Sequence, residues 1–423
     1  GNNIANVNTE GYSRQRLSLA DNAPTGSYLG QYGTGVRAVS VDLVFDQFLR
    51  GHLIGEEQEL GKWDAMTEAL GLVEGIFTET EDSGISKGVD DFWNAWQSLA
   101  SNPSGYAERA DLAAKTQSLT EMIQGAYGQL EEMDTTLNTD IGHSVSEVNQ
   151  LAGRIADLNG QILRAEATGQ GTADLADTRD RLISELAGHI DFTMETSGSA
   201  ININVGSGVS LVNGETNSTL SFNGTDLSVA GTAITSDVNG GRIAGMLSAK
   251  DSVAGYQGQL NTFASGLIAE VNTIHSAGYG LDNSQNNFFS GTDASNIELN
   301  PDLTANVNKI AAGDEMGAVG DNSVALAISD LATTKLLGGG TQTFGEFYST
   351  LAQDVGSDLS QAQTFSAHQS AIVASLQTQR ESISGVSLDE EMVNLMKYQH
   401  GYEAASKLIT TADEMLQTLM DMI

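Results

Sequence analysis

Apolar residues recur every three or four positions along most of this chain, which is the pattern of amphipathic helices. The longest such run extends from about Ala107 to about Ala167, with a candidate break near Asn138–Gly142. A helix of about 50 residues would reach about 75 Å at a rise of 1.5 Å per residue. That length is typical of a bundle or a coiled coil rather than of a globular core.

The same periodicity predicts helices in both halves of the chain. The last of them begins after Ser387, because Ser387 and Glu390 have the spacing of a capping box. The other expected helices are Val41–Phe77, about Val89–Leu99, about Ala173–Gly188, Ile243 to about Ser276, and about Phe344 to about Ile383.

The period changes to two between about residues 191 and 239. Ile201, Ile203 and Val205 alternate with polar residues, and Asn213-Gly214 and Asn223-Gly224 follow as turn signals. Alternation interrupted by Asn-Gly pairs indicates β-hairpins. Residues 1–40 are polar and rich in glycine, and we expect loops there with a little extended structure.

These patterns predict a mainly α fold. We expect an elongated multi-domain helical bundle or coiled coil formed by both chain ends, with a small antiparallel β insertion in the middle. The expected parts are an N-terminal axial segment with loops (1–40), a helical bundle in three parts (41–190, 240–282 and 323–384), the β insertion (191–239), an irregular polar connection (283–322) and a C-terminal axial coiled-coil helix (385–423).

The final helical stretch has an apolar residue at every seventh position from Leu388 to Ile423. An apolar stripe that runs to the end of the sequence needs a partner helix to cover it, so we expect packing between subunits. The alternative is an ordinary core helix packed within this chain. The candidate packing residues are Leu388, Met392, Leu395, Tyr398, Tyr402, Ile409, Leu416, Leu419 and Ile423.

Composition excludes several classes of protein. The formal net charge is −36, from 55 acidic and 19 basic residues, which disfavours binding to nucleic acid or to anionic lipid. The chain has no cysteine, so it has neither disulfides nor a thiolate metal site. No apolar run approaches the roughly 18–20 residues that a membrane span needs.

The sequence offers little chemistry. None of its six histidines lies in a His-Glu-x-x-His pattern, and the pair His143 and Glu147 is more typical of a solvated helix surface than of a metal site. Residues 282–287 could hold a cation only loosely, because they lack the central glycine and terminal glutamate of a calcium loop. We therefore expect no catalysis, no cofactor and no metal.

Four segments resemble a known family. Residues 3–15 are similar to the N-terminal signature of bacterial flagellar rod, hook and hook-associated proteins, and residues 384–419 resemble their C-terminal signature. Residues 177–186 and residues 270–281, followed by Asn287-Phe-Phe-Ser-Gly, narrow the resemblance to the hook-associated protein 1 family. The matching positions of the N-terminal axial motif are Asn3, Ala5, Asn6, Asn8, Thr9, Gly11, Tyr12 and Arg14.

The resemblance implies a structural subunit of the bacterial flagellum that forms the junction between hook and filament by coiled-coil packing of its terminal helices. It implies a ring of about eleven copies, with the hook protein on one side and a second junction protein on the filament side. It also implies an export chaperone on the C-terminal helix, export by the flagellar type III apparatus and an extracellular location. Neither nucleic acid nor membrane is an expected partner.

Two departures from the family pattern bear on these expectations. A first helix expected ahead of Gly1 is not in this sequence, and the β insertion is short. Two alternatives remain open at this point. One is a hook or rod axial subunit of the same organelle, and the other is a surface adhesin or binding module that uses the β insertion.

Overall fold

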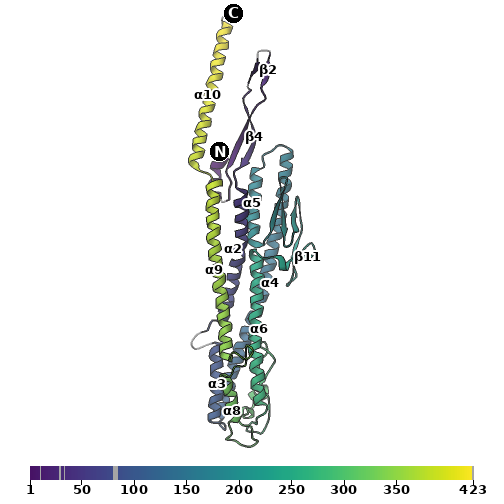
Figure 1. Cartoon of the computed structure of the whole chain (residues 1–423), viewed down its shortest axis with the longest axis vertical. Coiled ribbons are helices and arrows are strands. Elements are labelled where there is room, and N and C mark those ends of the chain that lie inside the picture. The colour runs from purple at the N-terminus through teal and green to yellow at the C-terminus, as the bar shows by residue number, and fades with distance from the viewer. Residues whose placement is uncertain (10, 28–29, 33, 80–83, 422–423) are drawn as a thin grey trace.

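The computed structural model describes residues 1–9, 11–27, 30–32, 34–79 and 84–421. The molecule is elongated, and its long helices run along the longest axis (Figure 1). These helices are α2 (Gln47–Phe77), α4 (Tyr106–Ala167), α6 (Gly241–His275) and α9 (Phe344–Ser384). The prediction of a mainly α, elongated bundle with a small antiparallel insertion is confirmed.

Helix α4 is continuous over 62 residues, so the candidate break near residues 138–142 was wrong. Leu137 and Ile141 are both buried, and the apolar stripe therefore passes through the suspected break without interruption. Asn138 does not disturb the helix, because its side chain bonds to Asp134 and to Lys250 Nζ instead of to the backbone.

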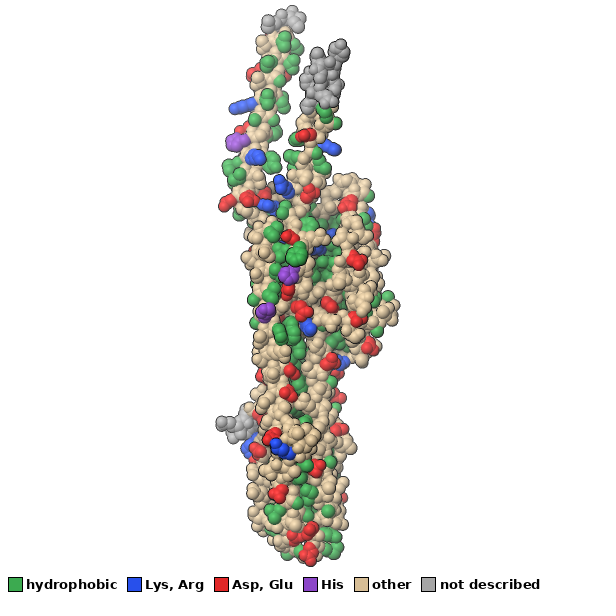
Figure 2. Space-filling view, in the orientation of Figure 1, with side chains coloured by type: hydrophobic (Ala, Val, Ile, Leu, Met, Phe, Trp, Pro, Cys, Tyr) green, Lys and Arg blue, Asp and Glu red, His purple; other side chains and the backbone are tan. Residues whose placement is uncertain are grey.

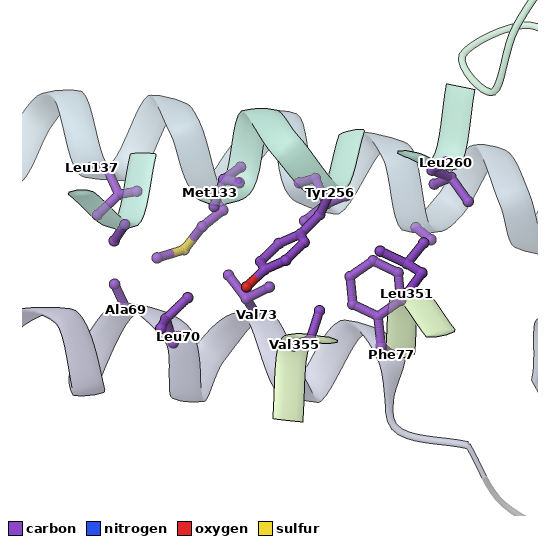
Figure 3. Close-up of a cluster of buried hydrophobic side chains, with 14 of the residues drawn as sticks. Ala69, Leu70, Val73, Phe77, Met133, Leu137, Tyr256, Leu260, Leu351 and Val355 are labelled. Carbon is purple, nitrogen blue, oxygen red and sulfur yellow. The ribbon is translucent and has the colours of Figure 1, made fainter. Parts of the chain in front are cut away.

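The bundle core is a layer to which all four long helices contribute. Figure 3 shows Leu70, Val73 and Phe77 of α2 facing residues of the other three helices. Tyr256 of α6 lies in this layer, and its hydroxyl donates to Asp358 Oδ2 at 2.6 Å. Burying a phenol costs little free energy when its hydroxyl has a hydrogen-bond partner. Tyr256 therefore leaves no unsatisfied polar group in this apolar layer.

Glycines allow the helix backbones to approach closely near the middle of α2. A Cβ atom on Gly245 would lie 2.2 Å from the carbonyl oxygen of Lys62, and one on Gly61 would lie 2.4 Å from that of Gly188. Glycine at these positions therefore brings α2 against α6 and against α5 (Ala173–His189).

The end of the bundle farthest from the chain termini is built from short elements. They pack around aromatic side chains that include Phe92, Trp96, Phe288 and Phe289. The elements are α3 (Ile85–Ser101), β12 (Phe289–Ser290), β13 (Glu298–Leu299), α7 (Pro301–Ala305), α8 (Ser323–Ser329) and the 3₁₀ helices η2 (Val307–Lys309) and η3 (Asp330–Ala332).

The β insertion lies against the side of α4 as two small antiparallel sheets. The first has the order β5 (Thr193–Ser197), β6 (Ala200–Val205), β7 (Val209–Asn213), β8 (Thr216–Asn217). The second is β9 (Leu220–Phe222), β10 (Leu227–Val229) and β11 (Thr232–Ala233), followed by η1 (Thr235–Asp237). Asn159 of α4 attaches the first sheet by bonding to the backbone of Ile201, and Asn149 attaches the second at Leu220.

Two extensions project beyond the end of the bundle where both chain termini lie (Figure 1). One is the helix α10 (Leu388–Asp421), and the other is an antiparallel hairpin that follows the short helix α1 (Asn2–Ala5). The hairpin strands are β1 (Gln15–Asp21), β2 (Thr25–Ser27), β3 (Gly30–Tyr32) and β4 (Val36–Leu43).

The hairpin corrects the expectation that a helical pattern begins at Val41. Val41 lies in β4, and α2 begins only at Gln47. Asp46 sets this start, because its Oδ1 accepts hydrogen bonds from the backbone N–H groups of Phe48 and Leu49. Valines that are three and two residues apart fit both the helical period and the strand period, so their spacing does not mark the start of α2. The Asp46 cap marks it.

Candidate assembly interface

Helix α10 has no buried residue among those that the structure describes. The predicted packing residues that the structure describes are all exposed, from 37% at Leu395 to 77% at Tyr402, and Figure 2 shows apolar side chains along this extension. We call Leu388, Met392, Leu395, Tyr398, Tyr402, Ile409, Leu416 and Leu419 the apolar ridge; Ile423 lies outside the described residues. The alternative of a core helix packed within this chain does not describe α10.

A groove runs along the lower part of the apolar ridge. Its walls are Gly1 and Ile4 on one side and Leu395, Tyr398 and Tyr402 on the other. This groove shows that α1 touches the ridge but leaves most of it open.

Asn3 joins three segments at the base of α10. Its Nδ2 donates to the Gln15 carbonyl at 3.0 Å and to Glu391 Oε1 at 2.9 Å. Its Oδ1 accepts from the Gln15 N–H and from the Tyr12 hydroxyl, both at 3.0 Å. The side chain is buried, so one amide satisfies four hydrogen bonds and connects α1, β1 and α10.

Arg14 connects the same region to the end of the bundle. Its backbone N–H donates to the Ser384 carbonyl at 2.8 Å, and its guanidinium pairs with Glu390 at 2.6 Å. This pairing corrects the predicted capping box. Ser387 Oγ accepts from the Glu390 N–H at 3.5 Å, but the Glu390 carboxylate binds Arg14 instead of returning to Ser387.

The start of α5 completes this region. Asp177 accepts two hydrogen bonds from the Ser13 N–H, at 3.1 and 3.3 Å, and Gln15 Nε2 donates to Asp174 at 2.6 Å. Burial raises the pKa of the Asp177 carboxyl, and the Ser13 donor opposes that rise. Burial also raises the pKa of Tyr12, with smaller contributions from nearby carboxylates.

We call the meeting of residues 3–15, 174–181 and 384–391 the elbow. Three of the four signature segments quoted from the sequence therefore converge at one place. Gly11 allows the N-terminal segment to pass close to α5. Its φ is +76°, which favours glycine, and a Cβ there would lie 3.1 Å from Arg181 Cγ.

The other N-terminal motif residues act locally. Asn6 bonds back to Asn2, and Thr9 bonds to Asn6, so both shape the turn after α1. Ala5 ends that helix, and Asn8 makes no hydrogen bond with the described residues. The sequence analysis did not identify Asp174 and Glu391. No periodic pattern distinguishes these residues, and their hydrogen-bond partners are distant in sequence and come close through folding.

The fourth signature segment lies at the opposite end of the bundle. Within it, Asn272 Oδ1 accepts from the N–H groups of Phe288 and Phe289, and His275 is fully buried. Among the described residues no group of three or more His, Asp or Glu side chains could hold a metal ion. No helix in the described ranges is long and apolar enough to cross a bilayer.

Two family models match the sequence. One describes the helical domain of the flagellar hook-associated protein FlgK and matches residues 70–289, more than half of the chain. The other describes the C-terminal part of the flagellar basal body rod proteins FlgEFG and matches residues 377–422, which include all of α10.

Named relatives agree with these matches. Flagellar hook-associated protein 1 of Bacillus subtilis is 27% identical, over 99% of this chain and 94% of its own, and that of Escherichia coli is 27% identical, over 99% and 95%. The solved structure of FlgK from Burkholderia pseudomallei, titled a flagellar hook junction protein, superposes with a TM-score of 0.71 at 15% identity. It covers 79% of this chain and 100% of that chain, and it shows the same fold. The chain therefore belongs to the family of the flagellar hook-associated protein FlgK.

Proposed function

We propose that this chain is a structural subunit of the bacterial flagellum and forms the junction between hook and filament. The apolar ridge of α10 carries this proposal, because it is a long regular surface that one copy leaves uncovered. Copies arranged around an axis would cover one another's ridges. The family to which the chain belongs supports the same assignment.

Energetics favour many identical contacts over one strong contact. Burying one Leu or Ile side chain stabilises by about 1.5–3 kcal/mol. A closed ring repeats each contact once per subunit, so modest adhesion becomes a durable assembly. The hairpin adds to this surface, since Leu17, Leu19, Val36 and Val39 are exposed on it. An isolated two-stranded ribbon is marginal in water and gains stability when covered.

The remaining parts of the proposal follow from this surface and from the family. The ring would hold about eleven copies, with the hook protein and a second junction protein as neighbours. Before assembly an exposed ridge invites aggregation, which is a reason for an export chaperone on α10 and for export by the flagellar type III route. We assign no catalytic role.

We propose domains that separate the axial surface from the bundle. Residues 1–40 and 385–423 form the axial part, 41–190, 240–282 and 323–384 form the bundle, 283–322 connect its parts, and 191–239 form an outer β domain. A hook or rod subunit would share the C-terminal match over residues 377–422, whereas the match over residues 70–289 favours the junction.

Charged substitutions on the ridge test the proposal. Leu395→Asp and Ile409→Asp should leave the bundle folded, because neither side chain contributes to its core. Both should abolish incorporation into flagella in a strain that lacks its own copy, measured by immunoblotting of purified flagella.

Thr411→Asp is the matched control, since Thr411 is exposed on α10 but lies off the apolar ridge. It should assemble as the unaltered chain does. Normal filaments built with Leu395→Asp and Ile409→Asp would contradict the proposed role of the ridge.

A further inference from the structure

A cavity of about 350 Å³ lies in the bundle directly below the elbow, between α2, α5 and α9. Its floor is apolar and consists of Leu49, Leu53 and Ile54. Three of the chain's 19 basic residues, Arg50, Arg181 and Arg380, also line it. We call this space the elbow cavity. Asp46, Glu57 and Asp180 line it as well, so the arginines and carboxyl groups of the cavity are equal in number.

Two of these arginines, Arg181 and Arg380, form no ion pair within 4 Å among the described residues, although Arg181 lies near Asp177 and Arg380 near Glu57. Arg50 pairs with Asp180 at 2.7 Å, but Arg380 makes no side-chain hydrogen bond or ion pair with the described residues. Arg181 makes one long hydrogen bond, from Nη2 to Thr178 Oγ1 at 3.4 Å. Glu57 lies in the wall. Burial raises the pKa of its carboxyl to about 7 against the opposing effects of the Ser184 hydroxyl and the Arg380 charge, so Glu57 is only partly charged near neutral pH and neutralises Arg380 incompletely.

The first turn of α10 carries the complementary chemistry. It holds Asp389, Glu390 and Glu391, of which Glu390 binds Arg14 and Glu391 binds Asn3. Successive helical residues are about 100° apart, so Asp389 is directed away from the N-terminal segment that its neighbours contact. Asp389 is exposed and makes no ion pair among the described residues.

Exposed apolar side chains flank this carboxylate. Leu388 and Met392 are 48% and 51% exposed, and they lie one residue before and three residues after Asp389. An acid beside apolar groups fits a cavity that has an apolar floor and an arginine rim.

The two surfaces lie at the same level of the molecule. Ser384, the last residue of α9, lines the elbow cavity, and α10 begins at Leu388 (Figure 1). No residue of α10 lines the cavity of its own chain. Copies at equal height around an axis would bring the first turn of one towards the cavity of the next. Two different patches that fit one another make a head-to-tail contact, and such a contact forms a ring when the rotation from one copy to the next closes.

We propose that the elbow cavity receives the first turn of α10 from a second copy of this chain, with Asp389 of that copy paired to Arg380. This contact rests on the proposed function, because it requires a ring of identical subunits. It gives the ring a lateral contact on the bundle that uses only the first turn of α10 and leaves the apolar ridge from Leu395 onward for packing between axial helices.

Charge reversal tests the pairing in the full chain. Arg380→Glu and Asp389→Arg should each lower the amount of chain retained in purified flagella by on the order of ten-fold. The double variant restores opposite charges across the contact, and it should recover retention to within about two-fold of the unaltered chain. Asp389 lies outside the bundle, so Asp389→Arg remains informative even if Arg380→Glu misfolds. Full retention of Asp389→Arg, or a double variant no better than the single ones, would overturn the proposal.

Disulfide trapping tests proximity directly, because the chain has no cysteine of its own. Flagella built from a mixture of Arg380→Cys and Asp389→Cys chains should give covalent dimers on oxidation, and neither variant alone should. A disulfide needs Cα atoms about 4.4–6.8 Å apart. Replacing Asp389→Cys by Glu414→Cys, near the other end of α10, is the matched control and should give none. Assembled flagella without dimers would refute the cavity contact and leave the ridge proposal standing.

Discussion

At the scale of single residues, His275 anchors the end of the bundle farthest from the elbow. Its Nδ1 lies 2.7 Å from the Asn286 carbonyl, and its Nε2 accepts from the Ala311 N–H at 2.9 Å. These partners require a neutral ring with its proton on Nδ1. Burial lowers the pKa of His275 to about 4, and the nearby Arg109 guanidinium contributes.

This neutral histidine predicts a pH dependence of stability. Between about pH 6.5 and the folded pKa of about 4, the unfolded chain binds more protons than the folded one. The free energy of unfolding should therefore fall as pH falls through this window, by at most about 3 kcal/mol. Denaturant titrations at several pH values would measure it.

His275→Gln is the control, because an amide can donate and accept without titrating. Carboxyls with raised pKa values, such as Asp177 and Asp180, act in the opposite direction, and their contributions cancel in the difference between the two proteins. An identical pH slope in both proteins would contradict the assignment.

At the scale of elements, the elbow determines how α10 leaves the bundle. Asn3→Ala removes four hydrogen bonds there, including the one to Glu391. We expect the distribution of α10 orientations to become broader. The melting temperature of the bundle should change by no more than about 2 °C, because Asn3 lies outside the bundle core.

Spin labels at Ser360→Cys on α9 and Thr411→Cys on α10 would report this orientation as a distance distribution. Asn6→Ala is the matched control, because Asn6 is the same residue type in the same segment and, among the described residues, its side chain bonds only to Asn2 and Thr9. If Asn6→Ala broadens the distribution as much as Asn3→Ala does, the special role of Asn3 is wrong.

Periodicity identified the long helices but not every element boundary. Buried stripes determine α4, α5, α6 and α9, and these agree with the expected ranges to within a few residues. The last residues of β4, from Val41 on, were mistaken for the start of a helix, because the side chains of this strand are mostly exposed and leave no clean alternation. The elbow could not be predicted either, since Asn3, Asp177 and Glu391 are far apart in sequence and only the fold brings them together.

At the scale of the whole molecule, the chain has a closed bundle and an open axial part. The core of the bundle extends through α2, α4, α6 and α9, whereas the described residues of α10 bury nothing. The heptad pattern predicted that the ridge would need a partner. The elbow cavity left no sequence signal, because its lining comes from four separate segments.

This division predicts two rates of amide hydrogen exchange in one molecule. An isolated helix opens readily in water, so residues 388–421 of the monomeric chain should exchange near the rate of an unprotected helical peptide. Amides at the centres of α4 and α6 open only with the bundle, and they should exchange more slowly by at least about 10³-fold.

Assembly should then protect α10 far more than it protects the bundle. Exchange measured on the purified chain and on isolated flagella would separate the two states, with sedimentation showing that the purified chain is monomeric. Neighbouring copies are required for the protection of α10 because its own chain covers so little of the ridge. Strong protection of residues 388–421 in a chain shown to be monomeric would mean that the ridge is already satisfied, and the physical reason for a ring built on α10 would be lost.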